Sequence, residues 1–378
     1  MVEGRRTTLV CHYVTEQPPT TLEATLSSAD IVFLVASYGM SGVEMLNFSQ
    51  TRRVNVDGTH NVLQACITSH VPILIYTSSV NVVFGGQPIE NADETYPVYP
   101  LNEHTDEYSR TKAIAESAIL AANGTKFSGE AGDTLQCSAP LSSILLTAAI
   151  RTNGIYGEGE ERHFKRIVNA IKLNALFFRY GYPNNLVDWT HVDNLALSHM
   201  LAAVKLIKDA AATADTNQDS ITGKGTAYFV SDGDPRNNFA LLQETLIPLY
   251  KMYGPFFSVP LPIIYRTGYF LELSFRLLSP YLRFPTVLLL TRAEVSKSGQ
   301  HHTFNISKIR RELGYQSVTN TLDGFRAMVT YLEVADRNAV HRTLWQREPR
   351  LKWWVALFGV VLGLGLLRGR PALRWWRG

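Results

Sequence analysis

The stretch DEYSRTKAIAES, residues 106–117, places Tyr108 and Lys112 four residues apart in a segment that reads as a helix. Side chains at this spacing lie one turn apart on the same helix face, so the two groups could act together. A free tyrosine has a pKa of about 10, too high for a base at neutral pH, but a neighbouring ammonium favours the phenolate. The pair therefore suits proton transfer. The alternative is a tyrosine at the edge of a core and a lysine in water.

Ser79 supplies a third polar group at the end of the apolar run LIYTSS. Open α/β sheets bind ligands at the carboxyl ends of their strands. Oxidation of a secondary alcohol by hydride transfer needs a base for the proton, a polar group that holds the oxygen and a cation that keeps the base ionisable. Tyr108, Ser79 and Lys112 match these needs. Ser79 alone has an ordinary explanation, because strands often end in serine for turn formation.

Short apolar runs alternate with helical segments through the first part of the chain. The runs are rich in β-branched and aromatic residues, as in strands buried on both faces, and lie at 31–36, 71–77 and 143–150. Helical spacing occurs between them, at 54–69 and around Tyr108. A helix at 192–207 and a strand at 227–233 follow. This order predicts an α/β fold with a Rossmann-like, doubly wound parallel sheet.

Five segments carry a resemblance to a known family. They are VASYGMSG (35–42), FGGQPIE (84–90), DEYSRTKAIAE (106–116), FVSDGDPRNNF (229–239) and LLTRAEVSKSGQHHTFNISKIRRELGY (289–315). With them, residues 30 to about 335 resemble the extended short-chain dehydrogenase/reductases. The similarity is to the 3-beta-hydroxysteroid dehydrogenase branch, which includes sterol decarboxylating dehydrogenases, and within it to family 42E.

The resemblance implies a role for each of the three polar residues. In such enzymes a serine or threonine orients the substrate oxygen, which corresponds to Ser79. The tyrosine is the proton acceptor, here Tyr108, and the lysine binds the nicotinamide ribose, here Lys112. The implied cofactor is NAD or NADP.

Three further residues take their expected roles from the same resemblance. Asn55 in NVDGTHNVL matches an asparagine that supports a proton relay through water. Its alternative reading is a plain turn near Asp57 and Gly58. Ala36 and Ser37 would lie where the chain passes the cofactor.

The beginning of the chain departs from the family pattern. A dinucleotide fold opens with a strand, a glycine-rich turn and a helix whose N-terminus receives the pyrophosphate. No G-x-x-G-x-x-G precedes ADIVF, and Tyr13 stands where the family has an acidic residue near the adenine. We therefore expect an N-terminally truncated Rossmann-like domain in which NAD(P) binding is severely weakened. The missing first strand would leave strand edges uncovered.

The sequence changes character after residue 250. Residues 254–290 are strongly apolar and interrupted by prolines, as in a lid over a core, an apolar substrate site or a segment that dips into a bilayer surface. Residues 353–367 are uncharged, and arginine alternates with tryptophan in 368–378, which favours a membrane anchor. The predicted units are a truncated dinucleotide-binding domain (1–250), a smaller apolar substrate or lid lobe (251–345) and a C-terminal membrane anchor (346–378).

Composition excludes several other classes. The 36 basic and 33 acidic side chains leave a net charge of +3, which gives no general attraction to nucleic acid. Three scattered cysteines are too few for a disulfide framework or a zinc site. Adjacent His301 and His302 point apart, so we expect no metal. A membrane-associated protein that faces the cytosol, at the endoplasmic reticulum, is the expected setting.

The predicted function is NAD(P)-dependent oxidation or reduction at a hydroxyl or keto carbon of an apolar, steroid- or sterol-like substrate in steroid metabolism. A nucleotide-sugar epimerase or dehydratase shares the serine, tyrosine and lysine, but it needs a polar second lobe. A cofactor-deficient, catalytically inactive membrane-bound binding or scaffold form is the other alternative. The expected partners are an apolar small molecule and a membrane, with a homodimer as a further expectation.

Overall fold

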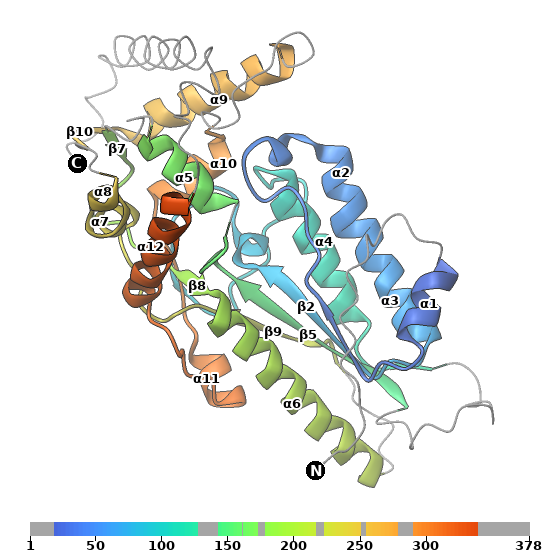
Figure 1. Ribbon diagram of the computed structural model, residues 1–378. Helices are drawn as coiled ribbons and strands as arrows, with labels where there is room; N and C mark the ends of the chain where they lie inside the picture. The colour runs from blue at the N-terminus through green and yellow to red at the C-terminus, as the bar shows by residue number, and fades with distance from the viewer. Residues whose placement is uncertain are drawn as a thin grey trace.

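A parallel sheet lies at the centre of the molecule (Figure 1). The computed structural model describes residues 19–127, 143–160, 162–172, 178–216, 223–250, 255–278 and 290–338. The sheet holds β1 (Ile31–Leu34), β2 (Ile73–Ser79), β5 (Ile144–Thr152) and β9 (Thr226–Val230) in that order, all parallel. A short strand, β4 (Thr125–Lys126), pairs antiparallel with the start of β5. The Rossmann-like parallel α/β sheet predicted from the sequence is confirmed.

Helices cover both faces of this sheet, which explains why β2 is apolar throughout. Successive side chains of a strand point to opposite faces. Ile73 and Ile75 pack in the cluster that holds α6 (Val192–Thr216), whereas Leu74 and Tyr76 pack in the cluster that holds α3 (Gly58–Thr68) and α4 (Glu107–Ala121). All seven residues of β2 are therefore buried.

The helical segment before β2 is less regular than predicted. It begins with α2 (Phe48–Arg52), continues as a π-helical turn, η2 (Arg53–Asp57), and then becomes α3. Single π turns inside helices occur often at functional sites, because they displace a side chain from its regular direction. Here the displaced turn contains Asn55.

The strand β1 forms one border of the described sheet. Within the described residues it pairs with β2 alone, and α1 (Pro19–Leu26) packs on α3 beside it. Phe33 on β1 is 38% exposed, and Val35 just beyond the strand is 63% exposed. These apolar side chains are unusual for a strand of a doubly wound sheet, which is normally buried on both faces.

A second lobe lies beyond the carboxyl ends of the strands (Figure 1). We use "second lobe" for three strand pairs and the helices around them. The pairs are β6 (Gly154–Tyr156) with β8 (Trp189–His191), β7 (Phe178–Tyr180) with β10 (Phe257–Val259), and β3 (Ile89–Ala92) with β11 (His302–Phe304). The helices are α5 (His163–Lys172), α7 (Asn238–Glu244), α8 (Leu246–Leu249), α9 (Leu261–Leu278), α10 (Arg292–Gly299) and α12 (Thr321–Asn338).

The core of the second lobe draws on residues from both sides of position 250. Tyr156, Phe164 and Leu241 pack there with Phe325 and Met328. Conversely, a helix from the C-terminal part of the chain, α11 (Ser307–Leu313), packs against β9 of the central sheet. The domain boundary at residue 250 stays a prediction. The polypeptide passes between the central sheet and the second lobe several times, both before and after this residue.

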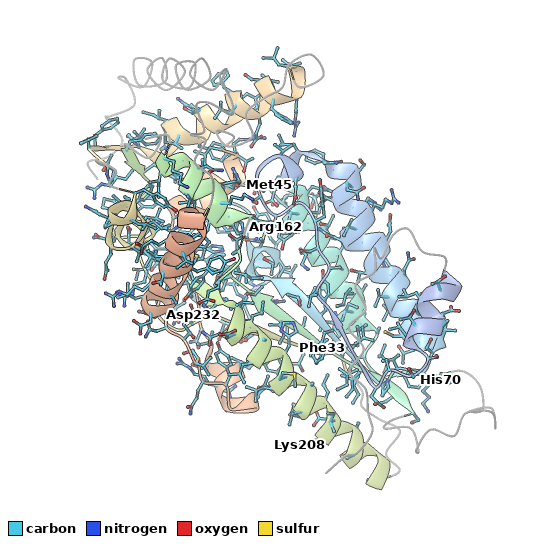
Figure 2. The ribbon with its side chains drawn as sticks, in the orientation of Figure 1. Phe33, Met45, His70, Arg162, Lys208 and Asp232 are labelled. Carbon is cyan, nitrogen blue, oxygen red and sulfur yellow. The ribbon has the colours of Figure 1, made fainter. Side chains whose placement is uncertain are left out.

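Asp232, just after β9, connects the central sheet with the second lobe (Figure 2). Its carboxylate accepts hydrogen bonds from the Tyr156 hydroxyl at 2.8 Å, the His191 amide at 2.7 Å and the Asn194 amide at 2.7 Å. Thr321, at the start of α12, donates to it at 3.3 Å. One buried carboxylate therefore fixes the second lobe to the sheet.

The predicted membrane anchor, residues 346–378, lies outside the described residues. Among the helices that the structure does describe, none combines the length and the apolar character that a membrane crossing requires.

Candidate active site

Tyr108 lies in the first turn of α4, at the carboxyl edge of the sheet. The helix begins there because Asp106 caps it: the Asp106 carboxylate accepts a hydrogen bond from the Ser109 amide at 2.8 Å and from the Ser109 hydroxyl at 2.8 Å. Tyr108 is buried, with 4% of its surface exposed. The cap therefore fixes the direction in which the tyrosine leaves the helix.

The structure brings Ser79 and Ser37 to Tyr108. Burial raises the pKa of Tyr108 to about 12, hydrogen bonding with the Ser79 and Ser37 side chains opposes that rise, and the negative charge of Asp106 adds to it. Ser79 is the last residue of β2, and its hydroxyl accepts a hydrogen bond from the Asn81 amide at 3.2 Å. The turn reading of Ser79 is thus observed, whereas its role toward a substrate oxygen stays a prediction.

Lys112 is one turn beyond Tyr108 and is 1% exposed. Its ammonium donates a hydrogen bond to the Thr77 carbonyl oxygen and lies 4.1 Å from the ring centre of Tyr76. Burial lowers the pKa of Lys112 to about 7, and the charge of Glu116 opposes that change. In the described structure the amine is thus bonded to β2, on the side of α4 that faces the sheet. It is not placed on the Tyr108 hydroxyl.

Behind Lys112 lies a buried ion pair. Arg151 on β5 donates to both carboxylate oxygens of Glu116, with its Nη2 at 2.7 Å from Oε1 and its Nε at 3.0 Å from Oε2. The Ser78 hydroxyl donates to the same carboxylate at 2.6 Å. Because both side chains are almost fully buried, the bidentate geometry is what compensates their desolvation.

Asn55 is 1% exposed and uses its whole side-chain amide. Its Oδ1 accepts from the Tyr38 amide at 2.8 Å, and its Nδ2 donates to the Tyr38 carbonyl at 2.9 Å and to the Thr111 hydroxyl at 3.0 Å. These bonds hold the loop after β1 against α4. The contacts differ from those of a plain turn at Asp57, which in the structure belongs to the continuing helix.

The loop that Asn55 holds contains Ala36 and Ser37, and its path depends on Gly39. This glycine has φ +90°, and a β-carbon at that position would lie 2.4 Å from the Thr51 hydroxyl oxygen. Both the left-handed backbone and the close approach therefore require glycine. The loop places the Ser37 hydroxyl beside Tyr108.

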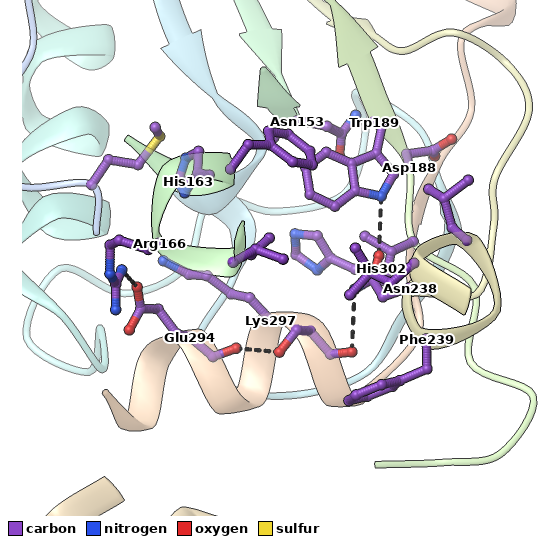
Figure 3. Close-up of a pocket in the computed structure, with 18 of the residues that line it drawn as sticks. Asn153, His163, Arg166, Asp188, Trp189, Asn238, Phe239, Glu294, Lys297 and His302 are labelled. Atoms are coloured by element: carbon purple, nitrogen blue, oxygen red, sulfur yellow. Dashed lines mark hydrogen bonds and ion pairs between the residues drawn. The ribbon is translucent and has the colours of Figure 1, made fainter. Parts of the chain in front are cut away.

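A cavity of about 340 Å³ opens beside Ser79 (Figure 3). Aromatic and aliphatic side chains of the second lobe form most of its wall, including Phe164, Phe178, Tyr180, Trp189, Phe239 and Phe325. A cavity with such walls suits an apolar ligand.

Polar and charged side chains also line this cavity. Several of them have a buried atom with no hydrogen-bond partner in the described structure, including Oδ1 of Asn153, Nε2 of His163 and Nδ1 of His302. Asn153 and His302 are each 5% exposed. The Asn153 Nδ2 donates to the Val230 carbonyl at 3.1 Å, which fixes the amide so that Oδ1 points elsewhere. Burial, and then the charge of Lys297, lowers the pKa of His302 to about 3, so this ring is neutral at physiological pH.

Sequence reasoning missed three residues of the site. Asp106 carried a usable signal, because an aspartate just before a predicted helix is a typical N-cap. Glu116 carried a weaker one, since it stands one turn beyond Lys112. Lys297 on α10 had none, because only the fold brings residue 297 to residue 106, where their ion pair measures 3.0 Å.

The residues present fit one end of a dinucleotide cofactor. Ser37, Tyr108 and Lys112 provide hydroxyl and amine groups at the carboxyl end of parallel strands, where a nicotinamide ribose would lie in a fold of this class. No described group of three or more His, Cys, Asp or Glu side chains could hold a metal ion.

Comparisons with known proteins agree with this fold. The sequence profile of the 3-beta hydroxysteroid dehydrogenase/isomerase family matches residues 4–255. The mouse protein named short-chain dehydrogenase/reductase family 42E member 1 is 45% identical over 288 residues, which cover 75% of this chain and 66% of the relative. An Arabidopsis thaliana protein named 3beta-hydroxysteroid-dehydrogenase/decarboxylase isoform 1 is 32% identical over 304 residues, which cover 80% of this chain and 62% of the relative.

Solved structures support the fold alone. MoeE5 in complex with UDP-glucose and NAD superposes with a TM-score of 0.55 at 17% identity, covering 86% of this chain and 85% of the other. The crystal structure of gox2253 gives a TM-score of 0.58 at 18% identity, covering 86% and 84%.

Proposed function

Because the chain belongs to the 3-beta hydroxysteroid dehydrogenase/isomerase family, a family of NAD(P)-dependent oxidoreductases, we propose that it oxidises or reduces a hydroxyl or keto carbon of a steroid- or sterol-like substrate. One observation carries this proposal: Ser79, whose side chain acts on the ionisation of Tyr108, lines the apolar cavity at the carboxyl end of β2. The first listed relatives extend beyond the matched region, since the matched residues span about two thirds of the mouse protein. The family of this chain is therefore a finding, whereas its activity is a proposal.

Tyr108 and Ser79 take complementary roles in the proposed reaction. Ser37, Tyr108 and Lys112 would hold the nicotinamide end of the cofactor, which would supply the hydride chemistry at the substrate carbon when bound. Ser79 holds the substrate oxygen, and Tyr108 accepts its proton during oxidation or returns it during reduction. The pKa of about 12 for Tyr108 is far above neutral, so the reaction requires additional positive charge or hydrogen bonding near the phenolate. Lys112 is the family candidate, and to contact the ribose its amine must leave the Thr77 carbonyl.

The walls of the cavity support an apolar substrate. Lys297 and Arg166 on this wall are already in ion pairs, so a phosphate or sugar would bury charged and hydroxyl groups mainly against aromatic rings, at a high desolvation cost. A fused-ring hydrocarbon instead gains from every contact with Phe164, Trp189 and Phe325. This favours the steroid-like substrate over the nucleotide sugars that are bound to some structural neighbours.

Helix α9 supports the proposal that the substrate arrives from a membrane. It presents Tyr269, Phe270 and Leu277 to solvent, with exposures of 45%, 52% and 62%. Arg276 of the same helix lies over the Phe48 ring, 5.1 Å from its centre. An apolar face flanked by arginine suits a bilayer surface. A cytosol-facing position at the endoplasmic reticulum is a separate part of the proposal.

A cofactor-deficient binding form is the second candidate, and one observation favours it. The amine of Lys112, which the resemblance assigns to the nicotinamide ribose, is buried and bonded to the Thr77 carbonyl. Such a form would bind the apolar ligand in the same cavity without turnover.

Two measurements on the full chain separate these candidates. The first is a fluorescence titration with NADH and NADPH, and the second is turnover of a 3β-hydroxysteroid such as pregnenolone, followed by the rise of NADH absorbance. The enzyme proposal expects both cofactor binding and turnover in the native chain, and it expects turnover to be lost or strongly reduced in Ser79→Ala and in Tyr108→Phe. Steroid binding without any cofactor response at millimolar NADH or NADPH would reject the enzyme and support the binding form.

A further inference from the structure

Lys297 connects the second lobe to the first turn of the tyrosine helix. It lies on α10, and Figure 3 shows its side chain reaching from that helix into the cavity. Its Nζ donates to the Asp106 carboxylate at 3.0 Å and to the Ser109 hydroxyl at 3.3 Å. The side chains of Lys297 and Asp106 are 17% and 6% exposed. Lys297 thus lines the ligand cavity and also forms an ion pair with Asp106, the residue that caps α4.

The same ammonium lies close to two aromatic rings. It is 5.9 Å from the ring centre of Tyr108 and 6.0 Å from that of Phe84. These distances are at the limit at which a cation and a ring face attract each other. Lys297 therefore lies near the ring of Tyr108, whereas hydrogen bonding with Ser79 and Ser37 acts on its hydroxyl.

Asp106 explains why a cation is needed at this place. Its carboxylate is required as the cap, because it accepts both hydrogen bonds from Ser109. Two residues away, however, its negative charge opposes ionisation of Tyr108 and helps to raise the tyrosine's pKa. The charge of Lys297, with the hydrogen bonds from Ser109, lowers the pKa of Asp106 despite its burial, so the carboxylate stays ionised.

We propose that Lys297 is a positioning residue for Tyr108, which neutralises the capping carboxylate of Asp106 and so allows the tyrosine beside it to ionise. This inference rests on the proposed function, in which Tyr108 exchanges the proton. Lys297 acts through Asp106. In this way it links the wall of the ligand cavity to Tyr108, the proposed proton acceptor.

Helix α10 is held firmly enough to deliver this charge. Its N-terminus is a capping box, in which Thr291 and Glu294 satisfy each other's backbone amides. Glu294 also forms an ion pair with Arg166 of α5 and accepts from the Gly42 amide at 3.1 Å. The helix is thus fastened at one end to the loop after β1 and near its other end to Asp106.

Other charged or titratable groups surround the tyrosine and must be kept constant in a test. Arg162, before α5, favours the phenolate, and the Tyr76 hydroxyl on β2 interacts with Tyr108 electrostatically. His104 and His302 lie near Lys297, and burial together with that charge lowers the pKa of each. Lys112 is on the same helix and is bonded to β2. None of these residues is changed in the variants below.

The test replaces Tyr108 in the full chain by 3-fluorotyrosine, whose phenol is more acidic than that of tyrosine, and follows its ionisation by fluorine NMR. Four backgrounds are compared: the native residues, Lys297→Arg, Lys297→Met, and Lys297→Met combined with Asp106→Asn. We expect the titration midpoint to move to higher pH in Lys297→Met, because the Asp106 charge is then uncompensated. It should remain near native in Lys297→Arg and return toward native in the double variant, whose asparagine still caps the helix.

The results separate this inference from the proposed function. Equal midpoints in all four backgrounds, or an equal shift in Lys297→Met and in the double variant, would overturn the role of Lys297 whether or not the chain turns over a steroid. The expected pattern in a chain without dehydrogenase activity would uphold the role of the lysine and reject the proposed function. In an active chain, the acid limb of the pH profile of kcat should move to higher pH in Lys297→Met alone, whereas a pure substrate contact would change KM without that shift.

Discussion

The amine of Lys112 donates a hydrogen bond to the carbonyl of Thr77 and rests 4.1 Å from the ring centre of Tyr76. A lysine in this position is enclosed by the sheet, and its charged form loses the water that would stabilise it. The proximity of Lys112 to Tyr108 along the helix therefore does not by itself place the positive charge on the phenol.

This burial predicts a pH dependence of stability. Burial lowers the pKa of Lys112 from 10.5 to about 7, so between these values the unfolded chain binds more protons than the folded one. The contribution of Lys112 to the free energy of unfolding therefore rises with pH across this window and is lost as pH falls toward 7. Between pH 7 and pH 10, the free energy of unfolding measured in urea should rise by a few kcal/mol more in the native chain than in Lys112→Met. A difference between the two proteins that does not change with pH would contradict the prediction.

Replacement of Tyr108 by phenylalanine removes the proposed proton acceptor and keeps the buried ring. We expect kcat for a 3β-hydroxysteroid to fall by about 10²–10⁴-fold, while NADH affinity stays nearly unchanged. The melting temperature provides the control, since the ring packing is retained. Native turnover in Tyr108→Phe would refute the assigned role.

The Asn55 amide predicts a structural effect that is separable from a proton relay. Asn55→Asp keeps an acceptor for the Tyr38 amide but loses both donors, to the Tyr38 carbonyl and the Thr111 hydroxyl. The free energy of unfolding should fall by about 2–5 kcal/mol, because buried acceptors are left unpaired and a carboxylate is buried. Asn102→Asp, at an exposed turn position, is the control. Equal stabilities of the two variants would show that the loop after β1 does not depend on Asn55.

The ion pair of Glu116 and Arg151 predicts a strong dependence on both partners. Arg151→Met leaves the Glu116 carboxylate buried with the Ser78 hydroxyl as its remaining described hydrogen-bond donor, and should cost about 3–5 kcal/mol of stability. Removing both charges, in Glu116→Leu with Arg151→Met, should recover most of that loss. Denaturant unfolding of the native chain, Arg151→Met, Glu116→Leu and the double variant measures the coupling, and simple additivity of the two single changes would argue against the pair.

The exposed face of α9 predicts attachment to lipid. Phe270→Glu together with Leu277→Glu should lower the fraction of full chain that floats with anionic phosphatidylserine vesicles, because charge is placed on the apolar face. Val318→Glu changes a side chain that is 66% exposed in another part of the molecule and should leave flotation unchanged. Equal loss in both proteins would indicate general electrostatic repulsion rather than a surface on α9.

The sequence alone determined the class of the central sheet and indicated the two hydroxyls to which we assign the proposed chemistry. Buried parallel strands are recognisable as apolar runs, Tyr108 lies within one of the segments that carry the family resemblance, and Ser79 shortly precedes another. Local spacing also placed Lys112 and Asn55 on helices. These features depend on neighbours in the chain, which is why a linear reading could find them.

Tertiary structure decided what those side chains contact. Lys112 bonds the sheet, and Asn55 holds a backbone segment 17 residues away. The charge nearest the cap of the tyrosine helix comes from Lys297, which is 191 residues from Asp106 in sequence. Electrostatic interactions act through space and their strength depends on burial, so they become defined only when distant segments pack together and exclude water.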